Sequence, residues 1–591
     1  MCGFFISPSS FDQIKANFLF EKYIAYRGVL PKKEIVCNQY NFKFSRLPIV
    51  DVDAYQNQPY QYKNHVLVFN GELYNYQDIR ELLEKKYEVQ FTTKSDVEVF
   101  LKGFVTLGPK EFFKIACGMW AYVISDKLGN FYWGRDEYGI KPLFFMKKSD
   151  KLFFSSSQPA LLESFDKYKL NNNILRRFIV TGFQDPNSFS FYENCDLVQP
   201  GNCYYFNYQN KDIQKEICLF SDKKILDKSL REVVDEVIIS QYPKEVNSSI
   251  ALSGGLDSSI ILHVLSKNNL SFASLSLDLL NSKKEKSLIF QTIKQYKKQH
   301  QFIKTKSSEL LNSCKEIIFN FGQPLRSCQP LHQYSLRKVA SQCNSKVFFT
   351  GDGSDEIFGG YTQGFFFFLK QLIDEGAKEN LIINKLNDFK DLINFNVEFP
   401  KDDIKKLIER KTNIFNQDQT WQKIFRNEKF TLPDTPKDLK SYCDFRLFRH
   451  PMPYWLMTED ILSLINGIET RIPFLDQRIV YKSKFLEKEK FYLKGKNKYQ
   501  LRKSFSDLPD HILNCKNKFP RPSDTTEFIF ENEISDYIEK FLRSENFKEL
   551  FQINHDYFLE VFKFDKDRKC SLRADNWFRI LTSYIFLNKI F

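Results

Sequence analysis

The second residue of this chain is a cysteine, and its type and position suit an N-terminal nucleophile. Removal of the initiator methionine before this small residue would leave the thiol and a free α-amine of Cys2 on one carbon. The α-amine titrates near pH 8 (roughly 7.7–8.0), so it can accept the thiol proton without a separate histidine. An early cysteine is more often buried and inert. The nucleophile hypothesis therefore depends on whether nearby segments supply a matching substrate site.

Three segments of the N-terminal third carry polar groups that suit amide chemistry. Arg46 stands in an apolar run, where its guanidinium can hold a carboxylate through two hydrogen bonds. Asn70-Gly71-Glu72 offers a side-chain amide, a backbone N–H and a carboxylate. The amide and the N–H are the donors of an oxyanion hole, worth roughly 3 kcal/mol each. Asp96 supplies a second carboxylate that could hold an ammonium group. Each segment alone has an ordinary explanation, a turn for Asn-Gly and an ion-pair partner for Arg46.

Short apolar runs separated by turn residues dominate residues 2–208. They predict strands at 65–69, 120–124 and 131–133, and a tight turn at Asn70-Gly71. Residues 77–86 have helical spacing, and 134–143 look structural. Strands that carry an N-terminal nucleophile and are flanked by helices indicate an α/β sandwich. A polar, lysine-containing stretch at 209–228 is predicted to link this part to the rest.

Beyond the linker, helices alternate with short apolar runs, which is typical of a parallel sheet with covering helices. A predicted strand at 246–252 runs into Ser253-Gly254-Gly255-Leu256-Asp257-Ser258-Ser259 and then into a helical pattern. The glycines let the backbone approach a phosphate, and the helix N-terminus presents unpaired N–H groups. No Gly-Lys-Ser/Thr follows, so this is not a Walker A loop.

A second predicted strand, 347–350, is followed by three carboxylates, Asp352, Asp355 and Glu356. Carboxylates gathered at the carboxyl end of a strand are costly unless they bind a cation or transfer a proton. Lys498 belongs to a lysine-rich stretch at 494–502, for which a solvated face is the ordinary explanation.

Composition narrows the classes of protein. The net charge of +13 suggests affinity for anions, but lysines are spread along the chain, which argues against nucleic acid as a partner. Twelve cysteines show no CxxC pair or zinc-like cluster. The apolar run at 365–369 is too short to span a membrane, and the start has no basic n-region. We expect a protein of the cytoplasm without a membrane partner.

Taken together, Cys2-Gly3 and the segments 46–51, 70–75 and 95–98 resemble the glutaminase domain of class II glutamine amidotransferases. The resemblance implies an N-terminal-nucleophile αββα sandwich over 2–208, in which Cys2 attacks the side-chain amide of glutamine and releases ammonia. Asn70 and Gly71 would stabilise the oxyanion. The implied glutamine site also holds the α-carboxylate at Arg46, the α-ammonium at Glu72 and Asp96, and backbone groups near Leu47, Ile49 and Val50.

The loop at 253–259 resembles the PP-loop of N-type ATP pyrophosphatases, and 467–476 and 494–502 resemble signatures of the glutamine-hydrolysing asparagine synthetase family. The resemblance implies an α/β ATP pyrophosphatase domain, adenine nucleotide α-hydrolase-like, over 229–591. Lys498 would contact phosphate, and Asp352, where many members have glutamate, could take a proton from ammonia. Mg²⁺ would be bound by Asp257 and Asp355. The implied ATP site comprises Leu252, Ser253, Gly254, Gly255, Asp257, Ser258, Leu277, Thr350 and Gly351.

The two halves together imply an amidotransferase. ATP would adenylate a carboxylate with release of pyrophosphate, and ammonia from the Cys2 site would displace AMP through an enclosed apolar passage. Aspartate is the expected acceptor, with Arg326 holding a carboxylate. The neighbours of Arg326 and a long stretch at 362–450, predicted to be helical, keep other acceptor carboxylates open, such as a uronic-acid sugar of a surface polysaccharide. The expected partners are glutamine, ATP and the acceptor, and a homodimer is left open. A catalytically silent, basic binding protein is a hypothesis of another class.

Overall fold

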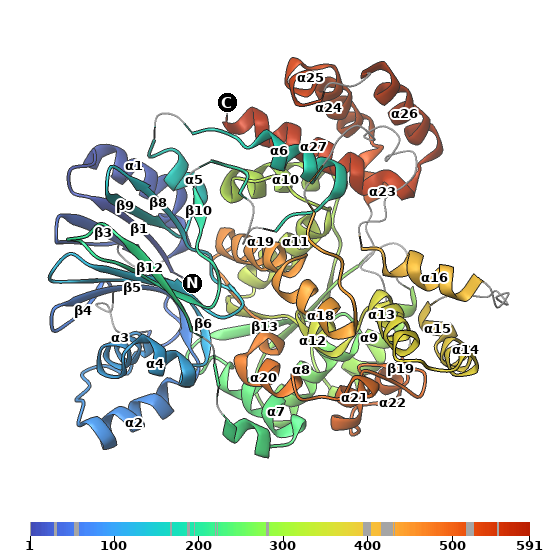
Figure 1. The fold of residues 1–591 in the computed structure, drawn as a ribbon, viewed down its shortest axis with the longest axis horizontal. Coiled ribbons are helices and arrows are strands. Elements are labelled where there is room, and N and C mark those ends of the chain that lie inside the picture. The colour runs from blue at the N-terminus through green and yellow to red at the C-terminus, as the bar shows by residue number, and fades with distance from the viewer. Residues whose placement is uncertain are drawn as a thin grey trace.

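The computed structural model describes most of the chain. The described ranges are 2–28, 32–52, 58–165, 168–185, 190–193, 195–218, 220–221, 223–278, 283–393, 403–414, 430, 432–515, 525–551 and 555–590. The sheets separate the molecule into an N-terminal and a C-terminal half (Figure 1), called here the glutaminase half and the synthetase half after the resemblance above.

The glutaminase half contains two antiparallel six-stranded sheets. One has the order β10-β8-β9-β1-β3-β2, and the other has the order β12-β11-β7-β6-β5-β4. The first is built from β1 (Gly3–Pro8), β2 (Lys33–Cys37), β3 (Tyr40–Ser45), β8 (Phe144–Lys148), β9 (Lys151–Ser155) and β10 (Asp196–Leu197). The second is built from β4 (Tyr60–Tyr62), β5 (His65–Leu73), β6 (Gly118–Asp126), β7 (Phe131–Arg135), β11 (Asn202–Phe206) and β12 (Ile213–Ile217).

The sheets pack face to face because each strand buries alternate side chains on its inner face. Phe4 and Phe42 of one sheet and Val68 and Trp133 of the other belong to one buried cluster between them. The outer face of the first sheet is covered by α1 (Gln13–Tyr23) and α5 (Gln158–Leu162), and that of the second by α2 (Tyr76–Tyr87), α3 (Asp96–Leu107) and α4 (Pro109–Ile115). The expected αββα sandwich is confirmed.

Asn70-Gly71 was expected to form a tight turn, and this prediction is wrong. Both residues lie within β5, where Asn70 pairs with Ala121 and Gly71 with Trp120 of β6. Gly71 has φ of 150°, and a Cβ there would lie 2.0 Å from the Met119 carbonyl oxygen. Glycine is therefore required by the close approach of two strands rather than by a reversal of the chain.

The synthetase half is built on a five-stranded parallel sheet of order β15-β14-β13-β16-β17. Its strands are β13 (Asn247–Ala251), β14 (Ala273–Leu277), β15 (His300–Ile303), β16 (Ser345–Phe349) and β17 (Glu469–Arg471). The helices nearest the site are α7 (Leu230–Ser240), α8 (Leu256–Lys267), α9 (Lys283–Tyr296), α10 (Ser307–Phe321), α11 (Gln329–Gln342), α12 (Ser354–Phe358), α18 (Leu439–Phe448), α19 (Met452–Ile465), α20 (Gln477–Ser483) and α21 (Tyr499–Ser504). The expected parallel sheet with covering helices is confirmed.

Two regions complete the picture. The described part of 362–450 is helical as expected, with α13 (Thr362–Asp374), α14 (Glu379–Asp388), α15 (Lys390–Ile393) and α16 (Asp403–Thr412) before α18, while 394–402, 415–429 and 431 lie outside the described residues. The expected linker differs: β12 within 209–228 pairs with β11, so the second sheet extends past residue 208. Near the C-terminus, α24 (Asn532–Arg543) and α27 (Ala574–Ile590) pack together.

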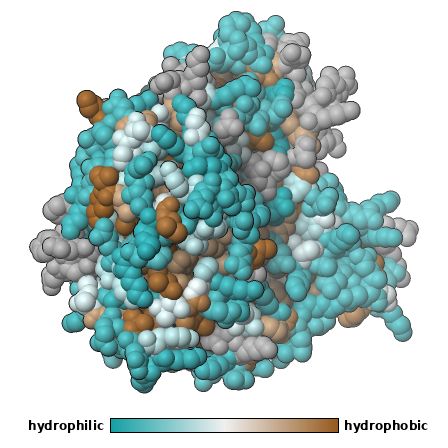
Figure 2. Space-filling model, turned by 60° about the vertical axis from the view of Figure 1, so that its left-hand side comes forward, coloured by the Kyte–Doolittle hydropathy of each residue, from teal (hydrophilic) through white to brown (hydrophobic). Residues whose placement is uncertain are grey.

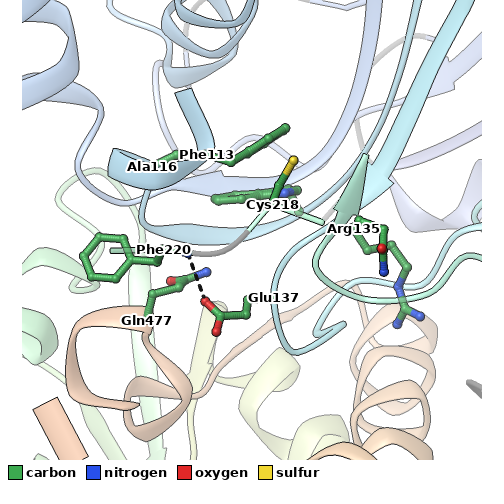
Figure 3. A pocket seen from close by; sticks show the side chains of 9 residues that line it. Phe113, Ala116, Arg135, Glu137, Cys218, Phe220 and Gln477 are labelled. Atoms are coloured by element: carbon green, nitrogen blue, oxygen red, sulfur yellow. Dashed lines mark hydrogen bonds between the residues drawn. The ribbon is translucent and has the colours of Figure 1, made fainter. Parts of the chain in front are cut away.

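The two halves meet along a buried junction, and Figure 1 places the N-terminus between them. Gln477 of α20 donates to the Gly118 carbonyl at 2.8 Å and accepts from the Gly118 N–H at 3.1 Å. Beside this clamp lies a cavity of about 10 Å³ (Figure 3), where Glu137 accepts a hydrogen bond from the Phe220 N–H. That volume admits about one water molecule, so this cavity is no substrate site.

Figure 2 shows a largely hydrophilic face on which apolar residues form separate small patches. Such scattered apolar residues are ordinary on a protein surface. Among the described residues, no helix has both the length and the apolar character needed to cross a bilayer.

Candidate functional site

Cys2 lies at the start of β1, at the junction of the two halves. Its backbone nitrogen donates a hydrogen bond to Oδ1 of Asn70 at 3.0 Å, and the residue is buried. Burial raises the pKa of the Cys2 thiol, while the N-terminal charge, a hydrogen bond from the Leu47 backbone and the charge of Arg46 oppose that rise. The structure thus brings together the predicted nucleophile, the predicted oxyanion residue and the segment that begins at Arg46.

Arg46 lies directly after β3 rather than inside a strand. Its Nη2 donates to the carbonyl oxygens of Val50 and Asp51 at 2.9 and 2.8 Å. The segment 46–51 therefore curls around its own arginine, with Leu47 and Ile49 buried. Of this segment, the Leu47 backbone and the charge of Arg46 act on the Cys2 thiol.

The side-chain N–H groups of Asn70 are available to a ligand. Its Oδ1 is occupied by the Cys2 nitrogen, but its buried Nδ2 has no hydrogen-bond partner among the described residues. A buried N–H without a partner is costly in the folded protein, so such a group usually serves a ligand. Together with the adjacent Gly71 backbone, this N–H can receive the oxyanion that forms when a thiol attacks an amide.

The two carboxylates expected to bind an ammonium group lie close together. Glu72 follows Gly71 in β5, and Asp96, the first residue of α3, accepts a hydrogen bond from the Leu73 N–H at 3.0 Å. Burial raises the pKa of Glu72 to about 8 and that of Asp96 to about 6, and each carboxylate is further raised by the negative charge of Glu469. A cation arriving beside them would favour the ionised form of both.

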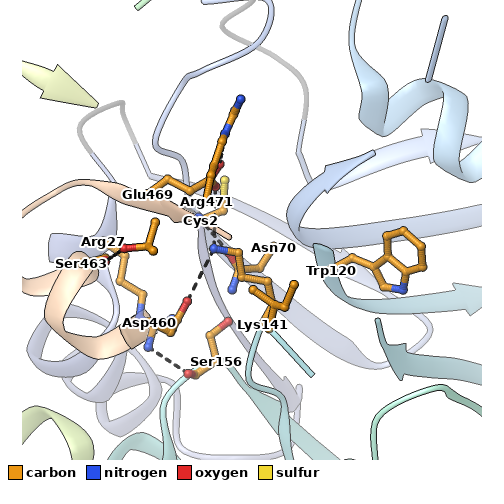
Figure 4. A network of polar contacts seen from close by, with 12 residues as sticks. Cys2, Arg27, Asn70, Trp120, Lys141, Ser156, Asp460, Ser463, Glu469 and Arg471 are labelled. Carbon is orange, nitrogen blue, oxygen red and sulfur yellow. Dashed lines mark hydrogen bonds and ion pairs between the residues drawn. The ribbon is translucent and has the colours of Figure 1, made fainter. Parts of the chain in front are cut away.

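The synthetase half contributes charged residues to this site that the sequence did not assign to it. Arg471 forms an ion pair with Glu72, and its Nε lies 3.4 Å from Oε1 of Glu469. Lys141 Nζ lies 3.8 Å from Glu469 and 3.7 Å from Asp460, and Arg27 also contacts Asp460 at 3.7 Å. Figure 4 shows these side chains converging beside Cys2.

These missed residues had weak signals in the sequence. Glu469 and Arg471 stand in the segment 467–476, which carried the resemblance but no role, and Asp460 follows Glu459 in an otherwise apolar helix. Lys141 lies in the segment expected to be structural, and the Arg135 and Asp136 side chains there do hold local backbone groups. Only the contact between residues some hundreds of positions apart makes Lys141 part of the site.

The glycine–serine loop lies between β13 and α8, in the strand–loop–helix order that the sequence predicted. Ser258 Oγ lies 3.2 Å from both the N–H and Oγ of Ser253, so the two serines close the loop. Gly255 precedes the first turn of α8 and provides no side-chain cap, which leaves the helix amides available to an anion. A Cβ on Gly351 would lie 2.8 Å from Cβ of Asp257, so the loop after β16 packs directly on this one.

Lys498 joins the two loops. Its Nζ lies 2.6 Å from Oδ2 of Asp257 and 2.6 Å from Oδ1 of Asp355, and it donates to Ser354 Oγ at 3.3 Å. Burial opposes the charge of Lys498, but the two carboxylates outweigh it and raise its pKa. Lys498 precedes α21 with a φ of 49°, in the left-handed region. The loop geometry therefore aims one ammonium at two carboxylates.

These groups line a cavity of about 430 Å³, large enough for a nucleotide and a small acceptor. Gly254 is the one proposed ATP-site residue that does not face this cavity, because its open side meets α9 instead. The remaining predicted residues that line it are Leu252, Ser253, Gly255, Asp257, Ser258, Leu277, Arg326, Thr350, Gly351, Asp352, Asp355 and Lys498.

The same cavity is also lined by Arg446 and Tyr361, which the sequence did not single out. Arg446 lies with its guanidinium 4.0 Å from the ring centre of Tyr361 and 3.7 Å from Oε1 of Glu356, which also accepts a hydrogen bond from the Tyr361 hydroxyl at 2.7 Å. Arg326 donates through Nε to the Gly182 carbonyl at 3.1 Å. Burial lowers the pKa of Arg326, and the neighbouring positive charge of Arg446 lowers it further. Two arginines and one carboxylate thus share one wall.

Comparisons with known proteins place both halves. A family model described as a glutamine amidotransferase domain matches residues 1–216, and one described as asparagine synthase matches residues 229–585. Asparagine synthetase [glutamine-hydrolyzing] 1 of Bacillus subtilis is 26% identical over 585 residues, covering 92% of this chain and 88% of that protein. Asparagine synthetase B of Escherichia coli is 29% identical over 341 residues, covering 54% of this chain and 56% of that protein.

Among solved structures, the glutamine phosphoribosylpyrophosphate amidotransferase from B. subtilis, complexed with ADP and GMP, covers 51% of this chain and 81% of its own. Its TM-score is 0.27 at 12% identity.

Proposed function

The chain belongs to the asparagine synthase family, and we propose that it uses ATP and glutamine to convert the side-chain carboxylate of aspartate to a carboxamide through an acyl-adenylate. The family is one of glutamine-dependent amidotransferases that use ATP as a substrate. The observation that carries the proposal is that one cavity contains both the phosphate-binding loop and a wall with two arginines. A carboxylate held there would lie in the same space as the α-phosphate of ATP.

In the glutaminase half, Cys2 would be the nucleophile and its own α-amine the base. The burial that raises the thiol pKa favours the protonated thiol at rest, so proton transfer to the amine accompanies attack on the amide. The free Nδ2 of Asn70 and the Gly71 N–H would stabilise the oxyanion, and each such donor is worth roughly 3 kcal/mol at the transition state. Arg46 would hold the α-carboxylate, and Glu72 and Asp96 the α-ammonium.

In the synthetase half, the donor set fits a magnesium–nucleotide complex. Asp257 and Asp355 both form ion pairs with Lys498, whose charge compensates theirs. Among the described residues, no group of three or more acidic, histidine or cysteine side chains could hold a metal by itself. One or two carboxylates plus phosphate oxygens are the usual ligands of Mg²⁺. When bound, Mg²⁺ would neutralise charge on the triphosphate. Lys498 would then contact phosphate, and Asp352 would accept the proton of attacking ammonia.

Ammonia would cross from one half to the other through the apolar interior. Leu47, whose backbone contacts Cys2, and Trp455, which lines the large cavity, belong to one continuous buried cluster. Met119 and Ile472 lie in the same cluster. Ammonia is protonated and not nucleophilic in neutral water, so transfer through such an interior would preserve its reactivity.

Aspartate is favoured as the acceptor by the charges on the far wall. Arg326 or Arg446 can hold its α-carboxylate, and Glu356 its α-ammonium, which leaves the second carboxylate for adenylation. All cysteines of the chain are free thiols, in agreement with the reducing cytoplasm that we propose as its location.

A second acceptor class is favoured by the aromatic side chains of the same wall. Tyr361, Tyr454 and Trp455 line the cavity and could pack against a sugar ring, as a uronic acid would present. In this reading Arg446 would hold the single carboxylate of the sugar acid.

The test is pyrophosphate release by the purified protein with ATP, Mg²⁺ and ammonium across a panel of carboxylic acids. We expect release with aspartate and the corresponding carboxamide as product. Release with a sugar acid but none with aspartate would reject aspartate and support the second class. The absence of release with every acid would contradict the synthetase function itself.

A further inference from the structure

We propose that Arg471 of the synthetase half is a positioning residue for the glutamine site of the other half, and that its guanidinium orients Glu72 and favours the ionised carboxylate that receives the α-ammonium of glutamine. The inference rests on the proposed glutaminase function, because it takes Glu72 as part of the glutamine site. It makes that site incomplete until the two halves are docked.

The contact crosses the junction between the halves. Glu469 and Arg471 are alternate residues of β17, so their side chains lie on the same face of the strand. Arg471 is 2% exposed and forms an ion pair with Glu72, while its Nε lies 3.4 Å from Glu469. Its Nη1 donates to the carbonyl of Gln241. One guanidinium is therefore shared between a carboxylate of its own strand and one of the other half.

The backbone fixes where this guanidinium lies. Arg471 pairs with Phe349 of β16, and its carbonyl accepts a hydrogen bond from the Thr350 N–H at 3.1 Å. The side chain also passes the ring of Tyr74, with 5.9 Å between the guanidinium carbon and the ring centre. A side chain held by the pairing of β17 with β16 and by a partly buried ring presents its charge in one place, as a binding site requires.

The charges around Glu72 determine how readily its carboxyl group ionises. The charged and titratable groups that face Glu72 come from β17, from α3 and from the segment that follows β5: Arg471, Glu469, Asp96, Tyr74 and Tyr76. Burial raises the pKa of Glu72 to about 8; Arg471 lowers it, and Glu469 and Asp96 raise it. Without Arg471, Glu72 would remain protonated over a wider pH range. A protonated carboxyl cannot form an ion pair with an ammonium group.

The experiment measures glutamine binding to the full-length protein by calorimetry, with Cys2→Ala as the background so that no glutamine is consumed. Replacing the guanidinium by Arg471→Met should raise the Kd for glutamine at neutral pH by about tenfold or more, because one pKa unit corresponds to a factor of ten. The weakening should shrink as the pH rises, since Glu72 then ionises without help. Arg471→Lys keeps a positive charge and should restore a large part of the affinity.

Arg478→Met is the matched control. Arg478 is a largely buried arginine of the neighbouring helix α20, paired with Asp476 and hydrogen-bonded to Ser240, but it makes no contact with Glu72 among the described residues. It should leave the Kd for glutamine within about twofold of the parent, the scale expected for a site that shares no partner with the substrate. Equal weakening by Arg478→Met and Arg471→Met would assign the effect to general loss of structure and overturn the proposal.

Glu469→Gln supplies a test of opposite sign that does not depend on the folding of an arginine variant. In the parent protein, the Glu469 carboxylate competes with Glu72 for Arg471, and its charge raises the pKa of Glu72. Because the substitution removes this charge, glutamine should bind several-fold more tightly at neutral pH. Unchanged or weaker binding would overturn the proposal. If Arg471→Met bound glutamine as tightly as the parent, with the same pH dependence, this proposal would be overturned while the proposed glutaminase function would stand. No binding by the Cys2→Ala parent would overturn the proposed glutaminase function as well.

Discussion

The two candidate sites neutralise their charges in different ways. At the glutamine site the carboxylates and cations are buried and pair with each other across the two halves, as Glu72 does with Arg471. At the nucleotide site Asp257 and Asp355 have side chains about one-fifth exposed on the wall of a large cavity, and Lys498 compensates both. The first site would thus enclose a small substrate, whereas the second would admit a large, highly charged one.

The two candidate sites also differ in how they draw on the two halves of the molecule. The residues of the nucleotide site come from the loops after β13 and β16 and from the start of α21, all within the synthetase half. The glutamine site instead has Arg471 and Glu469 at its boundary. Changes at the nucleotide site should therefore leave glutamine hydrolysis intact, and changes among the oxyanion donors should leave ammonia-dependent synthesis intact.

The largest expected effect follows from Asp257→Asn. The substitution removes a carboxylate that faces both Lys498 and the proposed metal site, so pyrophosphate release should fall by about 10³-fold or more with glutamine or with ammonium as the nitrogen source. Pyrophosphate release and glutamate formation would be assayed side by side. Asp235→Asn, at an acid paired with Arg231 on α7, is the control and should keep both activities. Normal pyrophosphate release by Asp257→Asn would remove this residue from the nucleotide site.

A smaller effect is expected from Asn70→Ala. Loss of the free Nδ2 should lower the rate of glutamine hydrolysis by about 10²–10³-fold, the usual cost of one oxyanion donor, while ammonia-dependent synthesis continues. Asn130→Ala removes a buried asparagine of the same half that bonds Asp126 and should leave hydrolysis close to its original rate. Equal loss of ammonia-dependent synthesis would show that the two sites are not separable as described.

The contrast between the sites also decides what the sequence could predict. The geometry of the glycine–serine loop at 253–259 was predictable because its residues are contiguous. A strand, a glycine–serine loop and a helix in that order dictate the local geometry. The same holds for the carboxylates after β16. At the glutamine site the sequence correctly placed Cys2, Asn70, Glu72 and Asp96 in one region, although it interpreted Asn70-Gly71 as a turn.

Other features could not be predicted because they depend on tertiary packing. The position of Arg471 against Glu72 requires the docking of two domains, and no local pattern encodes that contact. Arg446 reaches the acceptor wall from α18, far along the chain from Arg326. The extension of the sheet by β12 was missed because a short, exposed edge strand has little hydrophobic alternation to reveal it.

The most direct test of the account compares nitrogen sources in the Cys2→Ala protein. Carboxamide formation would be measured with glutamine and, separately, with ammonium, each with ATP, Mg²⁺ and the acceptor identified by the panel. The account predicts that glutamine-dependent synthesis disappears while ammonium-dependent synthesis remains near that of the parent protein. Synthesis from glutamine that survives the loss of this thiol would contradict the assignment of Cys2 as the nucleophile.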